Sequence, residues 1–144
     1  MKPLYADALI EINKNNPDIG KVLKLLREAI KNGDSRAAYA LGTWYIEGTN
    51  VKKDLNKGIE LISVAAIDNV PEALYDLGYS FEAGNGVEKN LRLAMEYYLK
   101  AALLGDKQSI YEVGRGYYYG IGFDKDKNLA NIWLDHAERL GIKD

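Results

Sequence analysis

The chain has 144 residues, a formal net charge of −2 and no cysteine. This length suits a single domain, and the slightly acidic balance argues against nucleic-acid binding, which depends on many Lys and Arg contacts to phosphate. The lack of cysteine excludes disulfides and thiol chemistry, and it is compatible with a reducing compartment.

The N-terminal segment has no sustained apolar stretch, so it does not resemble a secretory signal. No other run approaches the roughly 18 apolar residues that a membrane-spanning helix needs. We therefore expect a soluble, cytoplasmic protein without a membrane span.

The sequence repeats itself every 36 residues, and no insertion is needed to keep the register. A period near this length is typical of stacked helix pairs. The sequence thus predicts an all-α fold, a right-handed α-solenoid of four antiparallel helix pairs in one domain, with rows at 1–36, 37–72, 73–108 and 109–144. The clearest columns are Leu41, Leu77 and Val113; Gly42, Gly78 and Gly114; Gly48, Gly84 and Gly120; and Asp54, Asn90 and Asp126.

The first row, 1–36, is a weak copy of the others. Its first helix is predicted from about Leu4 to Asn13, with Tyr5 and Leu9 in the core columns. Asp18 falls in the column that caps the second helix. Because terminal repeats are commonly atypical, this row is predicted to be a degenerate N-terminal cap repeat.

The row 37–72 begins with an amphipathic helix, whose apolar residues recur at helical spacing from Ser35 to Glu47. Trp44 is expected in its core face. Gly42 borders this face, where the lack of a side chain allows a neighbouring helix to approach closely. Gly48 is expected to end the helix in a left-handed conformation.

The row 73–108 predicts a second helix from about Leu91 to Leu104, capped by Asn90 and ending near Gly105. Asn and Asp are favoured at this position because their side chains accept hydrogen bonds from the first amide groups of the helix. The row 109–144 follows the same pattern, with Asp126 as the cap and Trp133 in a core column.

These columns resemble the Sel-one-like repeat family, a branch of the tetratricopeptide-like α-solenoids. The resemblance implies a non-catalytic adaptor that holds a protein or peptide in a concave groove, as relatives do in bacterial signalling, envelope and host-interaction systems. Cysteine-rich secreted relatives have been linked to β-lactam binding, but this chain lacks their cysteines. The fullest copy contains Ala73, Leu77, Gly78, Phe81, Gly84, Gly86, Val87, Asn90, Ala94, Tyr97, Ala101, Ala102 and Gly105.

Positions opposite the core face of each first helix line the concave surface in tetratricopeptide-like stacks. Six of the eleven tyrosines fall there, and tyrosine is favoured in binding hot spots. Those in the column of Tyr39, Tyr75 and Tyr111 could equally pack between helices. Tyr79, Tyr118 and Tyr119 fall in variable columns, which favours binding. The predicted partner-binding residues are Tyr39, Thr43, Ile46, Glu72, Tyr75, Asp76, Tyr79, Glu82, Tyr111, Glu112, Arg115, Tyr118 and Tyr119.

The carboxylates at Glu72, Asp76, Glu82 and Glu112 make this surface mildly acidic, with Arg36 and Arg115 as isolated counter-charges. Complementary charge steers association. The expected partner is therefore a basic or mixed-charge protein segment with apolar anchors.

No residue set indicates catalysis, a metal or a cofactor. His136 is the only histidine, and the sequence has no cysteine with which it could complete a metal site. The Gly-x-Gly turns follow helices rather than strands, so they do not match a nucleotide-binding loop. The charged run Lys52-Lys53-Asp54 is expected to be a solvated loop.

Three functions from different classes remain open. The leading one is a non-catalytic protein-interaction module that binds its partner in the groove. The second is a cytoplasmic immunity protein that neutralises a bacterial competition toxin. The third is a hydrolase of β-lactam or cell-wall substrates. Self-association through the C-terminal helix face is also considered, because little sequence follows the last helix to cover it.

Overall fold

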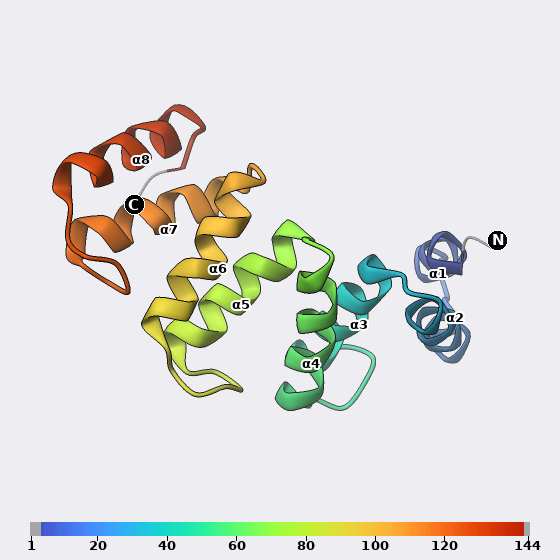
Figure 1. Ribbon diagram of the computed structural model, residues 1–144. Helices are drawn as coiled ribbons and strands as arrows, with labels where there is room; N and C mark the ends of the chain where they lie inside the picture. The colour runs from blue at the N-terminus through green and yellow to red at the C-terminus, as the bar shows by residue number, and fades with distance from the viewer. Residues whose placement is uncertain (1–3, 143–144) are drawn as a thin grey trace. The chain divides into compact units, whose positions relative to one another are not determined.

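The computed structural model describes residues 4–142, and this part of the chain forms α-helices without any β-strand (Figure 1). The all-α class is confirmed, and most predicted helix bounds agree within one residue. The helices are α1 (Leu4–Ile12), α2 (Ile19–Lys31), α3 (Ser35–Glu47), α4 (Leu55–Ile67), α5 (Pro71–Ala83), α6 (Leu91–Leu103), α7 (Lys107–Tyr119) and α8 (Lys127–Arg139).

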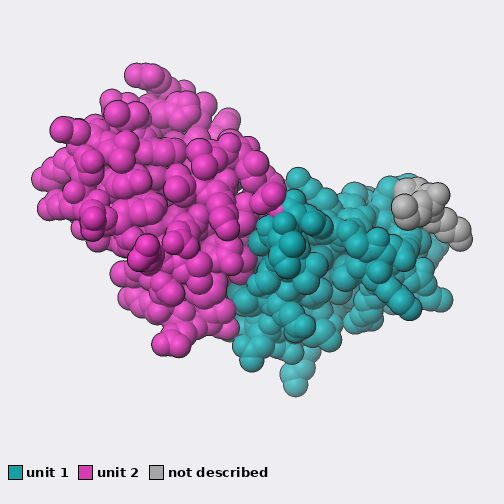
Figure 2. Space-filling view, in the orientation of Figure 1, with its two compact units in different colours: residues 1–68 teal, residues 69–144 magenta. Residues whose placement is uncertain are grey.

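The helices belong to two compact units, residues 1–68 and residues 69–144, which are coloured separately in Figure 2. In unit 1, α1 packs on α2, α2 on α3 and α3 on α4. In unit 2, α5 packs on α6, α6 on α7 and α7 on α8. Packing between successive helices is the arrangement of an α-solenoid. Within residues 4–142, no helix is long and apolar enough to cross a membrane.

The second helix of each pair begins at the predicted cap. The side chains of Asp18, Asp54, Asn90 and Asp126 each accept a hydrogen bond from the amide three residues later, at 3.1, 3.1, 3.0 and 3.0 Å. These bonds satisfy amide groups that have no partner within the helix. The first helices α3, α5 and α7 end, as predicted, at left-handed glycines, of which Gly48 has a φ of 73°.

Glycines inside the first helices allow close contact with the second. A Cβ added to Gly42 would lie 2.8 Å from Ile62 Cγ1 and 3.0 Å from the carbonyl oxygen of Gly58. At Gly114 the same atom would lie 2.8 Å from Leu134 Cγ. The predicted packing role of this glycine column is therefore confirmed.

Each unit has its own apolar core. Val22, Leu26 and Leu41 are buried in unit 1, and Met95, Tyr98 and Val113 are buried in unit 2. Trp44 packs against the first core and Trp133 against the second, and both are partly buried.

The core prediction for α1 is wrong at Leu9, whose side chain is 43% exposed. Ala8 is buried instead, and Leu4 and Ile12 pack with it against the core of unit 1. Residues spaced by four lie on one face of a helix, so α1 turns the Leu4, Ala8 and Ile12 face toward α2. Tyr5 packs against the same core, as predicted.

Candidate functional site

The predicted binding residues of unit 1 lie on α3, where they are partly buried. The Thr43 hydroxyl donates a hydrogen bond to the Tyr39 carbonyl oxygen at 3.0 Å. Ile46 contacts α4 at Gly58, where a Cβ would come within 2.5 Å of Ile46 Cγ1. Thr43 and Ile46 thus have contacts within their own helix pair.

In unit 2, Tyr75 on α5 and Tyr111 on α7 pack against the apolar core. The rings of Tyr75 and Tyr98 are 5.5 Å apart and tilted by 47°. Burial, together with the negative charge of Glu112, raises the pKa of Tyr75 above its ordinary value. The packing interpretation of this tyrosine column therefore applies to at least these two residues.

The tyrosines from the variable columns are more accessible. Tyr79 on α5 is 54% exposed and Tyr119 at the end of α7 is 65% exposed. Tyr118 is partly buried, and its ring meets that of Tyr119 edge to face with a centroid distance of 4.9 Å. Lys127 Nζ lies 5.2 Å from the centroid of the Tyr118 ring. Large rings with polar edges remain available to a partner at these positions.

A pocket of about 290 Å³ opens between α7 and α8, and we call it the tyrosine pocket. Leu134 of α8 contributes an apolar wall, whereas the other lining residues come from α7. Aromatic walls around a concave site can surround an apolar anchor and still offer hydroxyl groups. The lining residues are Tyr111, Arg115, Tyr118, Tyr119 and Leu134.

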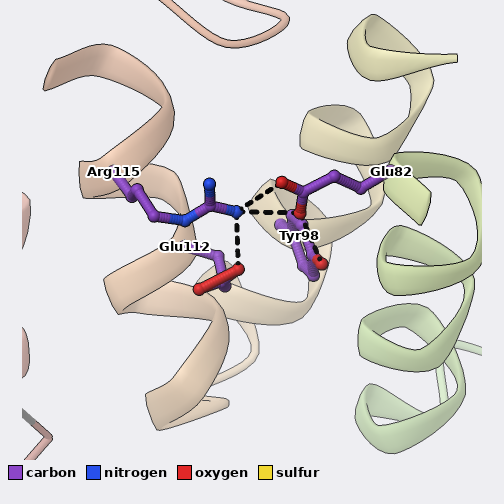
Figure 3. A network of polar contacts seen from close by, with 4 residues as sticks. All are labelled: Glu82, Tyr98, Glu112 and Arg115. Carbon is purple, nitrogen blue, oxygen red and sulfur yellow. Dashed lines mark hydrogen bonds and ion pairs between the residues drawn. The ribbon is translucent and has the colours of Figure 1, made fainter. Parts of the chain in front are cut away.

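Arg115 joins α7 to α5 through a network of charged hydrogen bonds (Figure 3). Its Nη2 donates to both carboxylate oxygens of Glu82, at 2.8 and 2.6 Å, and to Glu112 Oε2 at 2.9 Å. The Tyr98 hydroxyl donates to Glu82 Oε1 at 3.1 Å. Hydrogen bonds between ionised partners are stronger than neutral ones, so this network fixes the Arg115 side chain beside the tyrosine pocket.

The prediction that Arg115 is an isolated counter-charge is therefore wrong. The sequence register shows on which face of its helix a residue lies. It does not show whether a long side chain such as that of Arg115 reaches a residue on another helix. Burial by itself lowers the pKa of the Arg115 guanidinium, but the hydrogen bonds from Glu112 and Glu82 outweigh burial and raise that pKa above its ordinary value. Two carboxylates with one guanidinium leave the cluster with one excess negative charge.

Tyr98 of α6 also contacts this surface through Glu82, although the residue is only 1% exposed. Burial and the negative charge of Glu82 raise the pKa of its hydroxyl. The sequence contains a sign of this role, because Tyr98 occupies the repeat position that holds Ile62 and Leu134 in the other repeats. A buried tyrosine in an otherwise aliphatic column needs a hydrogen-bond partner for its hydroxyl.

The other predicted acidic residues, Glu72 and Asp76, lie partly buried on α5. Within residues 4–142, no group of three or more His, Cys, Asp or Glu side chains is arranged to hold a metal ion. The geometry of unit 2 therefore combines exposed aromatic rings, a pocket and a fixed charged cluster.

A model of the Sel1 repeat matches residues 35–69, 71–106 and 107–141, which together form well over half of the chain. The chain belongs to the Sel1 repeat family. Sel1 repeats generally act as protein-interaction modules and are typically non-catalytic scaffolds. The predicted resemblance and the α-solenoid class are thereby confirmed.

Solved structures of other Sel1 repeat proteins have the same fold. A Sel1 repeat protein from Oxalobacter formigenes is 32% identical, with 84% of this chain and 91% of that chain covered and a TM-score of 0.78. The c5321 protective antigen of uropathogenic Escherichia coli is 25% identical, with a TM-score of 0.90. The comparison covers 96% of this chain but only 30% of that protein. A comparison with the curated proteins gives no match.

A further solved structure with this fold is that of an immunity protein. The immunity protein Pa5087 from Pseudomonas aeruginosa is 25% identical, with a TM-score of 0.63. The comparison covers 98% of this chain but only 55% of that protein.

Proposed function

We propose that this Sel1 repeat chain is a non-catalytic module that binds a protein or peptide in unit 2, on the surface formed by the tyrosine pocket and Tyr79. The tyrosine pocket is the main observation in support, because three tyrosines and Leu134 surround a space large enough for an apolar side chain. Tyrosine is also a residue type on which binding energy concentrates.

The charges on the same face support a basic or mixed-charge partner. Glu82 and Glu112 supply two carboxylates, against the single guanidinium of Arg115. An excess of one sign accelerates encounter with a partner of opposite sign. In this proposal an apolar anchor enters the tyrosine pocket while basic groups of the partner lie along α5 and α7.

The test begins with affinity purification of the chain from its native cells and identification of the protein that binds. The affinity of that protein is then measured for the wild type and for Tyr79→Ala/Tyr119→Ala. These two tyrosines are exposed, so their removal should preserve the fold. We expect affinity to fall by about tenfold or more, which is usual for hot-spot residues.

Leu103→Ala/Ile132→Ala provides the matched control. These residues are 73% and 66% exposed on α6 and α8 of the same unit. Their loss should change the affinity by less than about twofold, because they lie outside the proposed face. Unchanged binding by the tyrosine variant would contradict the proposed surface.

A toxin-neutralising role is the second candidate, and we base it on the likeness to the Pseudomonas aeruginosa immunity protein. Such a role is a special case of protein binding, in which the partner is a toxin. If a toxin gene lies beside the gene for this chain, co-expression should restore growth of cells that make the toxin. Absence of protection, with both proteins present in soluble form, would reject this candidate.

A further inference from the structure

A second pocket lies within unit 1, and we call it the basic pocket. Its volume is about 480 Å³. Its lining comes from α2, the end of α3, the loop that leads into α4, and the first turn of α4. Four cationic side chains face a single carboxylate among its lining residues, which are Arg27, Tyr45, Val51, Lys52, Lys53, Asp54 and Lys57.

The single carboxylate already has a structural role, because Asp54 caps α4 by accepting a hydrogen bond from the Lys57 amide at 3.1 Å. Among residues 4–142, neither Arg27 nor any of the three lysines forms an ion pair with a carboxylate. The basic pocket therefore holds an uncompensated positive charge.

Two of the cations converge on one buried phenol. Arg27 Nη2 donates to the Tyr45 hydroxyl at 3.4 Å, and Lys57 Nζ lies 5.0 Å from the centroid of the same ring. The hydrogen bond from Arg27, aided by the charge of Lys57, outweighs the effect of burial and lowers the pKa of Tyr45. Like charges held close together raise the local potential, which favours an anionic occupant.

Three of the corresponding positions in unit 2, two repeats later, are apolar. Leu99 stands in the column of Arg27, Leu129 in that of Lys57 and Phe123 in that of Val51. Phe123 stacks on Tyr117, the equivalent of Tyr45, with a centroid distance of 4.4 Å. In unit 2 a phenylalanine and two leucines thus stand where unit 1 has a valine and two cations.

Only one of the four cations recurs in all three Sel1 repeats of this chain. Lys53 corresponds to Lys89 and Lys125, and the Cβ of each lies close to the glycine that ends the preceding helix. The stem of this lysine therefore belongs to the repeat architecture. The repeat does not require a charge at Arg27 or Lys57, since unit 2 has leucine at both positions.

We infer that the basic pocket binds an acidic segment of the partner protein, with two or more Asp or Glu side chains in contact with Arg27, Lys52 and Lys57. The inference rests on the proposed function, in that the ligand is part of a protein. A single carboxylate would neutralise one cation, whereas four cations around about 480 Å³ fit several carboxylates.

The experiment uses the full chain and a fluorescein-labelled peptide of six consecutive glutamates, with a hexaglutamine peptide as the uncharged control. Fluorescence anisotropy at pH 7 should show binding of hexaglutamate only, and this binding should weaken as salt is added. Lys52→Gln/Lys57→Gln should weaken it by about tenfold, because both substituted lysines line the pocket.

Lys89→Gln/Lys125→Gln is the matched control, since it removes the same charge from exposed loop lysines outside the pocket. We expect less than about a twofold change for this variant. Val51→Phe tests the space independently of charge, because it introduces the residue that unit 2 has at this position. It should reduce hexaglutamate binding while leaving the net charge unchanged.

Three outcomes would overturn the inference: no binding of hexaglutamate, equal weakening by the two double-lysine variants, or no effect of Val51→Phe. Inorganic phosphate is the probe for a small-oxyanion site. If phosphate shifted the amide NMR signals of residues 51–57 and hexaglutamate did not, the acidic-segment assignment would be wrong. Tyr79→Ala/Tyr119→Ala should retain hexaglutamate binding, which separates this result from the test of the tyrosine surface.

Discussion

The ring of Tyr98 on α6 lies so close to Gly78 on α5 that a Cβ added to this glycine would be 2.6 Å from Tyr98 Cδ1. The same tyrosine is held at its hydroxyl by Glu82, at 3.1 Å. Gly78 and Glu82, one turn apart on α5, therefore contact the ring and the hydroxyl of the same tyrosine. Helix contact and the charged network of unit 2 depend on each other through Tyr98.

Gly78→Ala should destabilise the protein by about 1–3 kcal/mol, which is the usual cost of overpacking a core. The Tyr98 ring is rigid and cannot move aside without loss of its bond to Glu82. The gain in helix propensity from alanine, about 1 kcal/mol, should offset only part of this cost. Urea denaturation followed by far-ultraviolet circular dichroism measures the difference.

Gly20→Ala is the matched substitution on α2, where the added Cβ would meet Asp18 Oδ1 at 3.4 Å, an ordinary contact. Without a clash, the propensity gain should dominate and stabilise the protein by up to about 1 kcal/mol. Effects of equal sign at Gly20 and Gly78 would contradict the close-contact explanation.

Arg115→Met should destabilise unit 2 by about 1–3 kcal/mol, because Glu82 and Glu112 would keep their charges without the guanidinium between them. Both carboxylates are largely buried, with side-chain exposures of 23% and 11%. Chemical denaturation with urea provides the measurement.

Arg92→Met removes a cation that makes a looser ion pair with Glu96, at 3.7 Å and with an 85% exposed arginine side chain. Exposed pairs contribute little, so the change should stay within about 0.5 kcal/mol. A loss as large as that of Arg115→Met would show that arginine removal in general, and not the network, is responsible.

Glu11 on α1 should make the stability of unit 1 dependent on acid. Its carboxylate pairs with Lys14 at 2.9 Å and accepts a hydrogen bond from the Asp18 amide at 3.1 Å. These contacts lower the pKa of Glu11 from 4.5 to about 2. Because the folded-state pKa is depressed, the contribution is complete above about 4.5 and disappears as the pH falls toward 2.

The free energy of unfolding of Glu11→Gln should therefore differ most from wild type at neutral pH and converge with it in acid. Denaturation curves between pH 7 and the lowest pH at which the protein is folded test this. Glu60→Gln, on the exposed side of α4, makes the same change in net charge and serves as the reference. A constant difference across the pH range would refute the assignment.

Asn90→Ala should destabilise unit 2 by about 1 kcal/mol, because the Leu93 amide loses the side-chain oxygen that accepts its hydrogen bond at 3.0 Å. Asn90→Asp keeps the acceptor and adds a negative charge at the positive end of α6, so it should be at least as stable as wild type. Thermal unfolding of the three proteins compares them directly.

The fold could be predicted to near residue accuracy because its signals are local and repeated. Gly42, Asp54 and Gly48 each have a conformational reason for their identity, and that reason recurs in every later repeat. Leu9 was misplaced because the first repeat has lost those markers, so the rotation of α1 is set by its packing on α2. The division of the repeats into rows of a single domain stays a prediction.

The candidate site was less predictable because it depends on side-chain reach. Arg115 was included among the predicted binding residues, but nothing in the sequence indicated that its side chain bonds to Glu82 on another helix. The basic pocket was missed because Arg27 and Lys57 come from different helices and show no shared motif. Their replacement by leucine in a later repeat was visible in the sequence, and only the fold shows that these columns meet.

The main helix contacts within each unit join neighbours in the sequence, so each helix finds its partner within one repeat of itself. Such short-range contacts reduce the entropy of loop closure and favour rapid folding. During synthesis, α1 and α2 can associate while the later helices are still on the ribosome. Folding can thus proceed in the order of translation, because little apolar surface depends on a distant segment for burial.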